Sequence, residues 1–489
     1  MKIGEATLDP RGIEAMFSEA KCLPETPGGF PPSWVFSSVF YQIFLERFAN
    51  GNPRNDPKDT CRWGDQPTYT NFFGGDIEGL IERLDYLADL GVGAIYLNPI
   101  FLAPSNHKYD TQDYLLVDPH FGNLKSFGSL LDAAHNRGIR ILLDGVFNHT
   151  GDRFWAFQHV LREGARSPYA SWYHCREFPV RQEPQPNYEA WWGVSTLPKL
   201  NVANPDVLAY LTRVITFWTS LGIDGWRLDV PNEVPGFFWR YFRHLVREIN
   251  PDAYLVGEIW EDGRPWLAGD MFDAVMNYQW RDLAVKFFAT DALSLDHFTD
   301  GLDHLRSRYP EPVNNGLFNP LGSHDTARFL TMAGGDNRRL KLASVFQYSY
   351  PGVPVVYYGD EVGLSGQADP DCRKTMLWTP DQQDRDLLAH YRRLGRIRRS
   401  SPALWTGSFT PIHHRNQDRT WAFLREAEGE KVLTAINASS HDRTILVHPE
   451  NQDESGWEDL LRGGFYETGP ETGLEVKLPA MTGTILRAR

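Results

Sequence analysis

The chain lacks two features that would place it in or across a membrane. No uninterrupted apolar run approaches the roughly 20 residues that a membrane-spanning helix requires. The N-terminal stretch MKIGEATLDPRGIEAMF contains acidic residues and has no apolar segment of the kind found in secretory signals. These absences predict a soluble, cytoplasmic protein without a membrane partner.

Cysteine and positive charge are also scarce. The four cysteines, Cys22, Cys61, Cys175 and Cys372, are far apart and form neither a CxxC motif nor a Cys/His metal spacing. We therefore expect free thiols in a reducing compartment, with a Cys22–Cys61 disulfide as the less favoured alternative. The formal net charge of −14 argues against nucleic acid as a partner, because phosphate binding needs a basic surface. A neutral substrate is compatible with this charge.

The sequence is rich, by contrast, in short apolar strands that are each followed by a stretch with helical spacing. In segments such as residues 77–91 and 127–138, apolar residues fall at i, i+3, i+4 and i+7 and a glycine ends the helix. The strand-like runs are FYQIFLERF (40–48), AIYLNPI (94–100), RILLDGVFN (140–148), GWRLDV (225–230), AYLVGEIW (253–260), FDAVMNY (272–278), GLFNPLGS (316–323) and PVVYYGDE (354–361). This series of strand–helix units predicts an α/β fold, a (β/α)8 TIM barrel.

Two parts of the chain do not fit the strand–helix series. Residues 151–203 follow the third strand and contain no further strand, which indicates an inserted subdomain. After about residue 405, the runs TWAFLR, KVLTAIN and RTILVH alternate with polar turns, a pattern typical of antiparallel β-structure. The predicted units are an N-terminal extension (1–35), the catalytic barrel (36–150 and 204–405), the inserted subdomain B (151–203) and a C-terminal β-sandwich (406–489).

Acidic residues stand at the ends of four predicted strands. Asp144 ends the third strand, Asp229 the fourth and Glu258 the fifth, and Asp325 lies just beyond the seventh. Because the active site of such a barrel lies at the C-terminal ends of its strands, we expect these carboxyl groups to meet there.

An arginine precedes one of these acids in GWRLDV. Side chains alternate along a strand, so Arg227 and Asp229 point toward the mouth of the barrel. Trp226 and Leu228 then point back into the helical shell. An adjacent arginine keeps a carboxylate ionised, as a nucleophile requires. For this motif alone a buried structural ion pair is the simpler interpretation, but the acid on the next strand favours catalysis.

Glu258 is that second acid, and it ends the run VGEIW. Apolar neighbours and nearby negative charge predict a carboxyl that stays protonated and can act as an acid. Two carboxyl groups in different protonation states are what cleavage of a glycosidic bond requires. A separation near ~5 Å leads to retention through a covalent glycosyl-enzyme, and a wider gap leads to inversion. Adjacent strand ends favour the shorter separation.

Two histidines, His149 in FNHT and His324 in GSHDTAR, lie next to these acids. A single histidine is more often a core residue, but these positions favour hydrogen bonds to sugar hydroxyls. Asp325 has no cation near it before Arg328, so we expect it to accept hydrogen bonds from two sugar hydroxyls.

One region is a candidate metal site because it is rich in side-chain oxygens. It combines NGNPRND (50–56) with GGD (74–76), which supply Asn50, Asn52, Asn55, Asp56, Gly74 and Asp76. Hard oxygen donors at alternating positions suit calcium. The alternative is a polar turn without a metal. The sequence indicates no organic cofactor.

Four segments resemble the ordered signature segments of the α-amylase family, glycoside hydrolase family 13. They are DGVFNH (144–149), GWRLDVPNE (225–233), GEIW (257–260) and SHD (323–325). The resemblance implies that Asp229 is the nucleophile, Glu258 the acid/base, and Asp325 the third acid, which binds and distorts the sugar. The resemblance also implies that Arg227, His149 and His324 support these acids. Asp144 would be a structural acid, and Tyr109 would stack under the reacting ring.

Further segments resemble one branch of this family, that of neopullulanase, cyclomaltodextrinase and maltogenic amylase. LPKLN (197–201) is similar to the MPKLN segment of that branch, and Glu233 also fits it. Members usually begin with a separate β-sandwich domain that builds a dimer, whereas only about 35 residues precede the first strand here. Whether the chain is a monomer or a homo-oligomer is therefore left open. Related enzymes bind calcium at the 50–56 loop, and Asn52 replaces an acid that often stands there.

The expected function is a retaining α-glucan hydrolase with transglycosylation as a side activity. Its substrates would be maltooligosaccharides, cyclodextrins, pullulan or starch. We expect cleavage of α-1,4 bonds, with cleavage of α-1,6 bonds as a further option. Trp260, Trp191 and Trp192 are candidate platforms for sugar rings, with core packing as the alternative for the adjacent pair. The alternatives are a dedicated glucanotransferase or trehalose-forming enzyme, and a non-catalytic barrel that binds glycans.

Overall fold

The computed structural model of the chain describes residues 31–448, 456–469 and 473–489. In this part, eight parallel strands form one sheet in the order β8-β7-β6-β5-β2-β1-β10-β9. A parallel bridge between Met276 and Phe318 joins the two end strands, so the sheet closes and the predicted TIM barrel is confirmed. The strands are β1 (Phe40–Ile43), β2 (Ala94–Leu97), β5 (Arg140–Gly145), β6 (Gly225–Leu228), β7 (Tyr254–Gly257), β8 (Ala274–Val275), β9 (Phe318–Pro320) and β10 (Val353–Tyr357).

The barrel strands are shorter than the apolar runs that predict them. The run 40–48, for example, forms a strand only as far as Ile43, and a 3-10 turn follows over Leu45–Arg47. Glu46 and Arg47 form a buried ion pair within this turn. Glu46 also accepts a hydrogen bond from the backbone N–H of Gly74 at 2.9 Å, which ties the end of β1 to the 74–76 loop.

Helices cover the outside of the barrel, and several of them begin at a residue whose side chain caps the first turn. Asn123 caps α5 (Leu124–His135), and Asn204 caps α7 (Pro205–Ser220), which has a proline at its start. The segment 77–91, which has continuous helical spacing, is divided at Arg83 into α3 (Ile77–Glu82) and α4 (Leu84–Asp89). The Arg83 guanidinium lies over the Trp378 ring, 4.3 Å from its centroid. The remaining helices around the barrel are α2 (Ser33–Ser37), α8 (Gly236–Ile249), α9 (Tyr278–Ala284), α10 (Leu295–Arg306), α11 (Glu311–Gly316), α12 (Phe329–Met332), α13 (Asn337–Ser349), α14 (Arg385–Ser400) and α15 (Pro402–Thr406).

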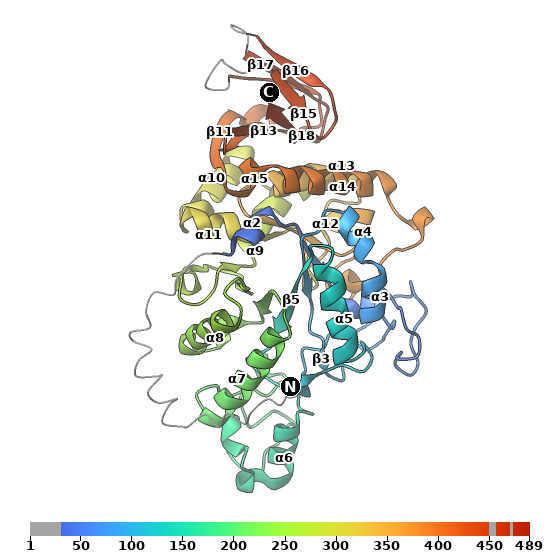
Figure 1. Cartoon of the computed structure of the whole chain (residues 1–489), viewed down its shortest axis with the longest axis vertical. Helices are drawn as coiled ribbons and strands as arrows, with labels where there is room; N and C mark the ends of the chain where they lie inside the picture. The colour runs from blue at the N-terminus through green and yellow to red at the C-terminus, as the bar shows by residue number, and fades with distance from the viewer. Residues whose placement is uncertain (1–30, 449–455, 470–472) are drawn as a thin grey trace.

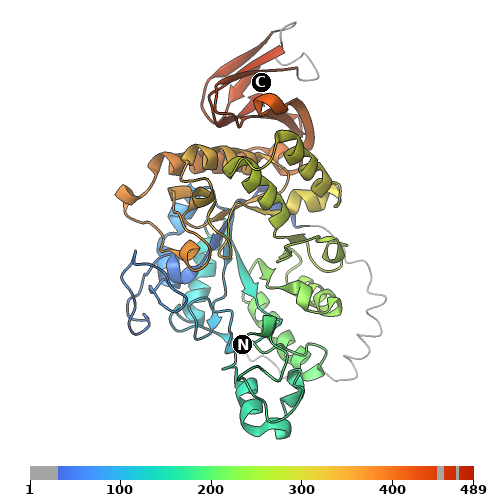
Figure 2. The ribbon, with the colours of Figure 1, turned by 180° about the vertical axis from the view of Figure 1, so that it is seen from behind.

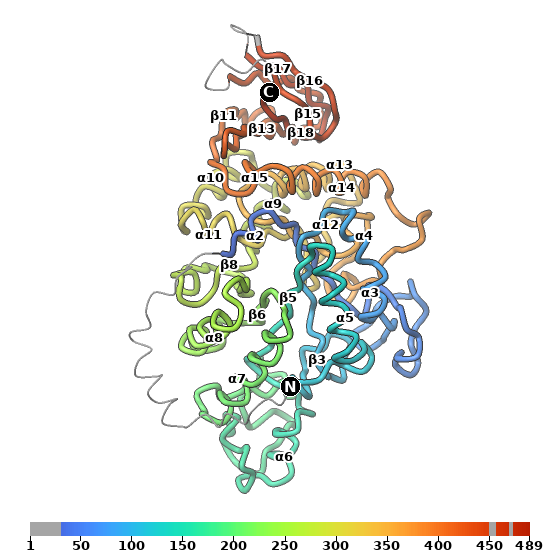
Figure 3. The backbone as a smooth tube through the Cα atoms, in the orientation of Figure 1, coloured from blue at the N-terminus to red at the C-terminus, as the bar shows by residue number. Residues whose placement is uncertain are grey.

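An excursion after β5 carries α6 (Trp155–Glu163) and several 3-10 turns. The backbone runs from the end of β5 into this region and returns through α7 to β6 (Figure 3). A small ribbon of β3 (Phe101–Leu102) and β4 (Asp113–Val117) lies between β2 and α5 in the chain. Loops that follow β2, β5, β6 and β7 therefore all belong to the same end of the barrel.

The C-terminal part is an eight-stranded antiparallel sheet at the opposite end of the molecule from α6 (Figures 1 and 2). Its strands are β11 (Ser408–Arg415), β12 (Thr420–Ala427), β13 (Glu430–Asn437), β14 (Arg443–Val447), β15 (Gly456–Asp459), β16 (Phe465–Gly469), β17 (Gly473–Leu478) and β18 (Thr482–Ala488). Trp421 packs on Phe346 of α13, and buried Arg425 donates to the Ser349 carbonyl at 2.9 Å. Buried side chains thus join this sheet to the helices of the barrel, and the sheet lies away from the strand ends that carry the acids.

Cys61, Cys175 and Cys372 form no disulfide with one another. Cys22 lies outside the described residues, as does most of the predicted N-terminal extension, so the alternative Cys22–Cys61 disulfide stays untested. In the part of the chain that the structure covers, no helix has both the length and the apolar character needed to cross a membrane. The cytoplasmic location stays a prediction.

Candidate active site

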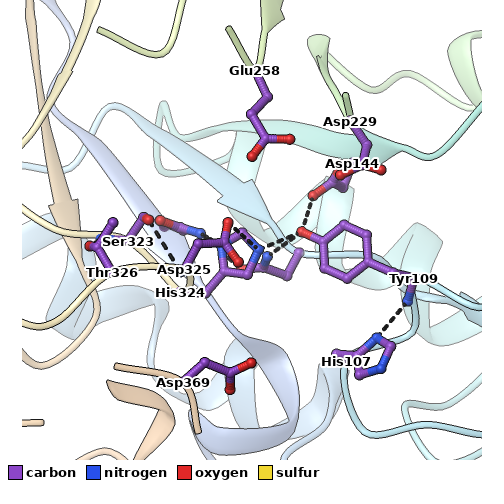
Figure 4. A network of polar contacts seen from close by, with 12 residues as sticks. His107, Tyr109, Asp144, Asp229, Glu258, Ser323, His324, Asp325, Thr326 and Asp369 are labelled. Carbon is purple, nitrogen blue, oxygen red and sulfur yellow. Dashed lines mark hydrogen bonds and ion pairs between the residues drawn. The ribbon is translucent and has the colours of Figure 1, made fainter. Parts of the chain in front are cut away.

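The four strand-end acids converge at the carboxyl end of the barrel. Asp144 lies in β5, Asp229 and Glu258 directly follow β6 and β7, and Asp325 lies in the loop after β9. In Figure 4 the carboxyl groups of Asp229, Glu258 and Asp325 face a shared space. Strands β6 and β7 are in register there, since the Glu258 N–H donates to the Leu228 carbonyl at 2.9 Å. We call Asp144, Asp229, Glu258 and Asp325 the acid cluster.

One buried guanidinium holds three members of the acid cluster. Arg227 Nη1 lies 2.8 Å from Asp144 Oδ1 and 2.9 Å from Asp229 Oδ1, and its Nη2 lies 2.8 Å from Glu258 Oε2. The neighbouring Trp226 points the other way and packs on Phe242 of α8. The alternation along β6 therefore explains why opposite charges occur in an apolar strand: they belong to the site, and the apolar residues belong to the shell.

The protonation of the acid cluster depends on burial as well as on Arg227. Burial raises the pKa of Asp229 well above its ordinary value; Arg227 opposes this shift, and Glu258 and Asp144 add to it. Arg227 thus favours the ionised form of Asp229, as the sequence predicts, but burial and the two neighbouring acids oppose it. Carboxyl groups packed around one cation share protons as a unit. Burial thus works against the ionised form of Asp229 that a nucleophile needs, and the charge of Arg227 works in its favour.

Tyr109 and His324 form a hydrogen-bonded layer beside the acid cluster. The Tyr109 hydroxyl donates to Asp144 Oδ2 at 2.8 Å, and its ring stacks on His324 with centroids 5.5 Å apart. Gln42 of β1 donates from Nε2 to His324 Nδ1 at 2.7 Å. Burial, with help from Arg373 and Arg227, lowers the pKa of His324 well below its ordinary value. The ring is therefore neutral, and the contacts place its proton on Nε2, which faces the Tyr109 hydroxyl at 2.7 Å.

Asp325 has a cation partner that its sequence surroundings do not reveal. Arg373 Nη2 lies 3.3 Å from Asp325 Oδ1, and its Nη1 lies 3.1 Å from Asp369 Oδ1. Arg328, the first arginine after Asp325 in the sequence, is instead fully buried and pairs with Asp360 at 2.7 Å. Burial and the charge of Glu258 raise the pKa of Asp325 to about 7, and Arg373 opposes this shift.

His149 lies at the start of the excursion after β5. Its Nε2 atom is buried and makes no hydrogen bond to any residue that the structure describes. Burial lowers the pKa of His149 to about 3, so the ring is neutral. Glu233 lies nearby in the loop after β6, where its Oε2 is 3.7 Å from Lys199 Nζ. This pair joins the β6 loop to the LPKLN segment.

Trp260 forms an exposed aromatic surface next to Glu258. Its ring stacks on Tyr278 with centroids 3.7 Å apart and planes 2° apart, and its Nε1 donates to Glu258 Oε1 at 3.1 Å. Tyr278 is buried, whereas Trp260 is 46% exposed. Tyr278 and Arg373 were not predicted as site residues, because Tyr278 begins α9 and Arg373 lies in the loop after β10, both outside the signature segments.

The candidate metal residues separate into two groups. Asn50 Nδ2 donates to Asp56 Oδ1 at 2.8 Å, and the Oδ1 atoms of Asn50 and Asn55 are buried with no hydrogen-bond partner among the described residues. A Cβ on Gly74 would lie 2.3 Å from Asp56 Oδ1, so only glycine fits there.

Asp76 and Asn52 have structural partners instead. Asp76 accepts from the N–H groups of Gly51, Asn52 and Gly79 at 3.1, 2.9 and 2.7 Å and caps α3. Asn52 Oδ1 accepts from the Arg54 N–H at 3.2 Å. Across the described ranges, no group of three His, Cys, Asp or Glu side chains forms a metal cluster. Any ion at this loop would therefore rest mainly on neutral oxygens.

The geometry of the site agrees with a sequence match. Residues 42–414 match the family described as alpha amylase, catalytic domain. This chain belongs to the α-amylase family. It is 48% identical over 450 residues to the cyclomaltodextrinase of Geobacillus thermopakistaniensis strain MAS1, which covers 92% of this chain and 76% of that protein. As a member of this family, the chain is a glycoside hydrolase.

Two further relatives cover the chain almost completely. Neopullulanase 2 of Thermoactinomyces vulgaris is 46% identical over 458 residues, which is 93% of this chain and 78% of that protein. The solved structure of the cyclic α-maltosyl-(1→6)-maltose hydrolase of Arthrobacter globiformis has a TM-score of 0.87 and 38% identity, and covers 94% of this chain and 100% of that chain.

Proposed function

We propose that this enzyme hydrolyses α-glucans with retention of configuration. The observation that supports this most directly is the arrangement of Asp229 and Glu258, which follow neighbouring in-register strands and contact the same guanidinium. Neighbouring strands lie about 4.8 Å apart. Carboxyl groups that start from this spacing fall near the ~5–5.5 Å separation of retaining glycosidases.

In the proposed first step, Asp229 attacks the anomeric carbon while Glu258 donates its proton to the glycosidic oxygen. The bond to the leaving sugar breaks, and a covalent glycosyl–Asp229 ester forms. In the second step, Glu258 takes a proton from water, which attacks the same carbon and releases Asp229. A sugar hydroxyl that replaces this water gives transglycosylation.

The surrounding residues would hold the reacting ring. Ionised Asp325 would accept hydrogen bonds from two hydroxyls, and neutral His324 and His149 would contact the same ring, the latter through its unpartnered Nε2. Arg227 and Asp144 would position the nucleophile, and the Tyr109 ring would form one wall of the ring site. Trp260 and Glu233 would contact the leaving part of the glucan.

The proposed substrates are maltooligosaccharides, cyclodextrins, pullulan and starch. The relatives support this range, since they are named a cyclomaltodextrinase, a neopullulanase and a hydrolase of a cyclic maltosyl-maltose. These names favour hydrolysis over a dedicated glucanotransferase or trehalose-forming reaction. The lack of a disulfide among Cys61, Cys175 and Cys372 is compatible with a cytoplasmic place of action, and one relative is named an intracellular maltogenic amylase.

Product analysis on γ-cyclodextrin, pullulan and starch tests the proposal. We expect reducing ends to appear with each cleaved substrate, and proton NMR to show the α-anomer first. Asp229→Asn is the control and should be inactive. Release of the β-anomer first would contradict retention, and chain redistribution without new reducing ends would favour the transferase.

We also propose that the 50–56 loop binds calcium. Asn50, Asn55 and Asp56 offer side-chain oxygens around the space that Gly74 leaves free, and two of these oxygens lack partners. Calcium suits such a donor set because it accepts neutral amide oxygens as well as carboxylates. A bound ion would fix this loop, which Glu46 and Gly74 join to β1.

A further inference from the structure

Trp191 and Trp192 form a stacked aromatic pair in the excursion after β5, in which Trp191 is half-buried and Trp192 is exposed. Their rings are nearly parallel, with centroids 5.0 Å apart and planes 9° apart. Trp192 is 81% exposed, more than any other large hydrophobic side chain that the structure describes. The core-packing alternative therefore does not hold for Trp192. A tryptophan left in water forgoes the burial that usually stabilises this residue type, so its exposure calls for an explanation.

The backbone at Trp192 is strained. Its φ and ψ are 47° and 27°, in the left-handed region that bulky side chains avoid. Such strain is typical of functional sites and persists only where surrounding contacts fix it. Here the contacts are backbone hydrogen bonds from Trp191 N to the Leu197 carbonyl at 3.0 Å and from Val194 N to the Trp191 carbonyl at 2.9 Å.

The pair is continuous with the proposed sugar site. The Trp191 ring lies 5.9 Å from the ring of His149, which lies in the loop after β5, the strand that carries Asp144. Backbone bridges of His149 with Lys199 and of Ala190 with Pro198 fix the Trp turn to that loop. Trp260 presents a second exposed stacked ring beside Glu258, after β7. Stacked aromatic rings thus come from two different loops at the carboxyl end of the barrel, which we call the rim.

We propose that Trp192, supported by Trp191, is a stacking platform for a glucose unit of an α-glucan outside the reacting ring, and that it determines the preference for long or cyclic substrates. This inference rests on the proposed function. The apolar face of a pyranose ring would lie on the exposed indole, and Trp191 would keep that indole in place. Short substrates would not reach the platform.

Binding to an inactive enzyme tests the platform without turnover. In an Asp229→Asn background, titration with maltoheptaose and with maltose would be followed by calorimetry. Trp192→Ala should weaken maltoheptaose binding by about five- to tenfold, the size of one aromatic stacking contact. Maltose binding should stay unchanged, and Trp192→Phe should keep most of the maltoheptaose affinity. Phe178→Ala, which removes another exposed aromatic of the same subdomain, is the matched control and should have no effect.

Turnover by the enzyme with Asp229 intact separates the two proposals. Trp192→Ala should raise KM for γ-cyclodextrin and leave kcat unchanged. Equal maltoheptaose affinity with and without Trp192, or no measurable binding, would overturn the platform even if the enzyme cleaves α-glucans. Tryptophan-dependent binding without turnover would support the platform and count against the proposed function. A Trp192→Ala protein that changes from dimer to monomer would instead mark the pair as an interface between copies and overturn the proposal.

Discussion

The acid cluster and the tryptophan pair are built in opposite ways. In the acid cluster, Arg227 is fully buried and contacts three carboxyl groups at 2.8 to 2.9 Å. In the tryptophan pair, Trp192 is 81% exposed and has one aromatic neighbour. The cluster lies at the ends of strands, and the pair lies on a turn of the inserted excursion. Our two proposals therefore place the chemistry at the ends of the barrel strands and the substrate preference on a loop outside them.

This difference predicts that changes in the acid cluster act on kcat and on stability, while changes at the rim act on KM. Glu258→Gln gives the largest expected effect. Loss of a general acid lowers kcat on starch by about 10²- to 10⁴-fold. Steady-state kinetics on starch and γ-cyclodextrin would measure this. Trp192→Ala is the corresponding change in the tryptophan pair, and kcat should stay unchanged in it. An equal loss of kcat in both variants would contradict the separate roles of the acid cluster and the tryptophan pair.

Arg227→Met tests how the acid cluster is held. The variant leaves Asp144, Asp229 and Glu258 buried without their shared cation. Removing one partner of a buried ion pair costs about 3–5 kcal/mol, so the free energy of unfolding should fall by this order. Chemical denaturation at neutral pH would measure it, with Trp192→Ala expected within about 0.5 kcal/mol of the unchanged protein. A loss below about 1 kcal/mol for Arg227→Met would show that the cluster is not held in this way.

Arg373→Met sharpens the comparison through pH. Burial raises the pKa of Asp325 to about 7, and Arg373 opposes that shift. Asp325 must be ionised to accept hydrogen bonds from sugar hydroxyls, so kcat/KM should fall as pH decreases through this pKa. Removing Arg373 raises the pKa further, and the acidic limb should move upward by about one pH unit. Arg373→Lys keeps the charge and should leave the limb near its original place. An acidic limb that does not move in Arg373→Met would contradict the assigned contact.

Calcium should have the smallest effect, on stability and not on the chemical step. At a hundredfold excess over its dissociation constant, an ion that binds only the folded state adds about 2.7 kcal/mol. This should raise the melting temperature by about 3 °C. Calorimetry with calcium and with EGTA would measure the shift, which Asp56→Ala should abolish. Equal melting temperatures in calcium and EGTA would rule out the proposed ion.

The barrel, and the meeting of the four acids at the ends of its strands, could be predicted from the sequence because both depend on local patterns. Strand period two placed Arg227 and Asp229 on one side of β6, and the order of the strands placed Glu258 beside them. Arg373 could not be found in this way, since it lies 3.3 Å from Asp325 but follows a different strand. The exposure of Trp192 could not be predicted from the local sequence either, because two adjacent tryptophans can occur in a core as well as on a surface loop.

The metal loop shows a similar limit. Residue type and spacing predicted oxygen donors at positions 50–56 and 74–76, and the structure does bring Asn50 and Asp56 together around Gly74. The same pattern gave no sign that the Asp76 carboxylate would be engaged by three backbone N–H groups. Composition identifies donors, whereas the fold determines which of their lone pairs stay free.

The central claim is that Asp229 forms a covalent bond to the sugar while Glu258 handles the proton. The most direct measurement is mass spectrometry of Glu258→Gln enzyme incubated with α-maltosyl fluoride. Fluoride leaves without a proton, so the C1–F bond breaks and the C1–Asp229 ester forms, but hydrolysis lacks its base and the ester accumulates. The account predicts one maltosyl unit on the peptide that contains Asp229. Absence of a label, or a label on the peptide that contains Asp325, would contradict it.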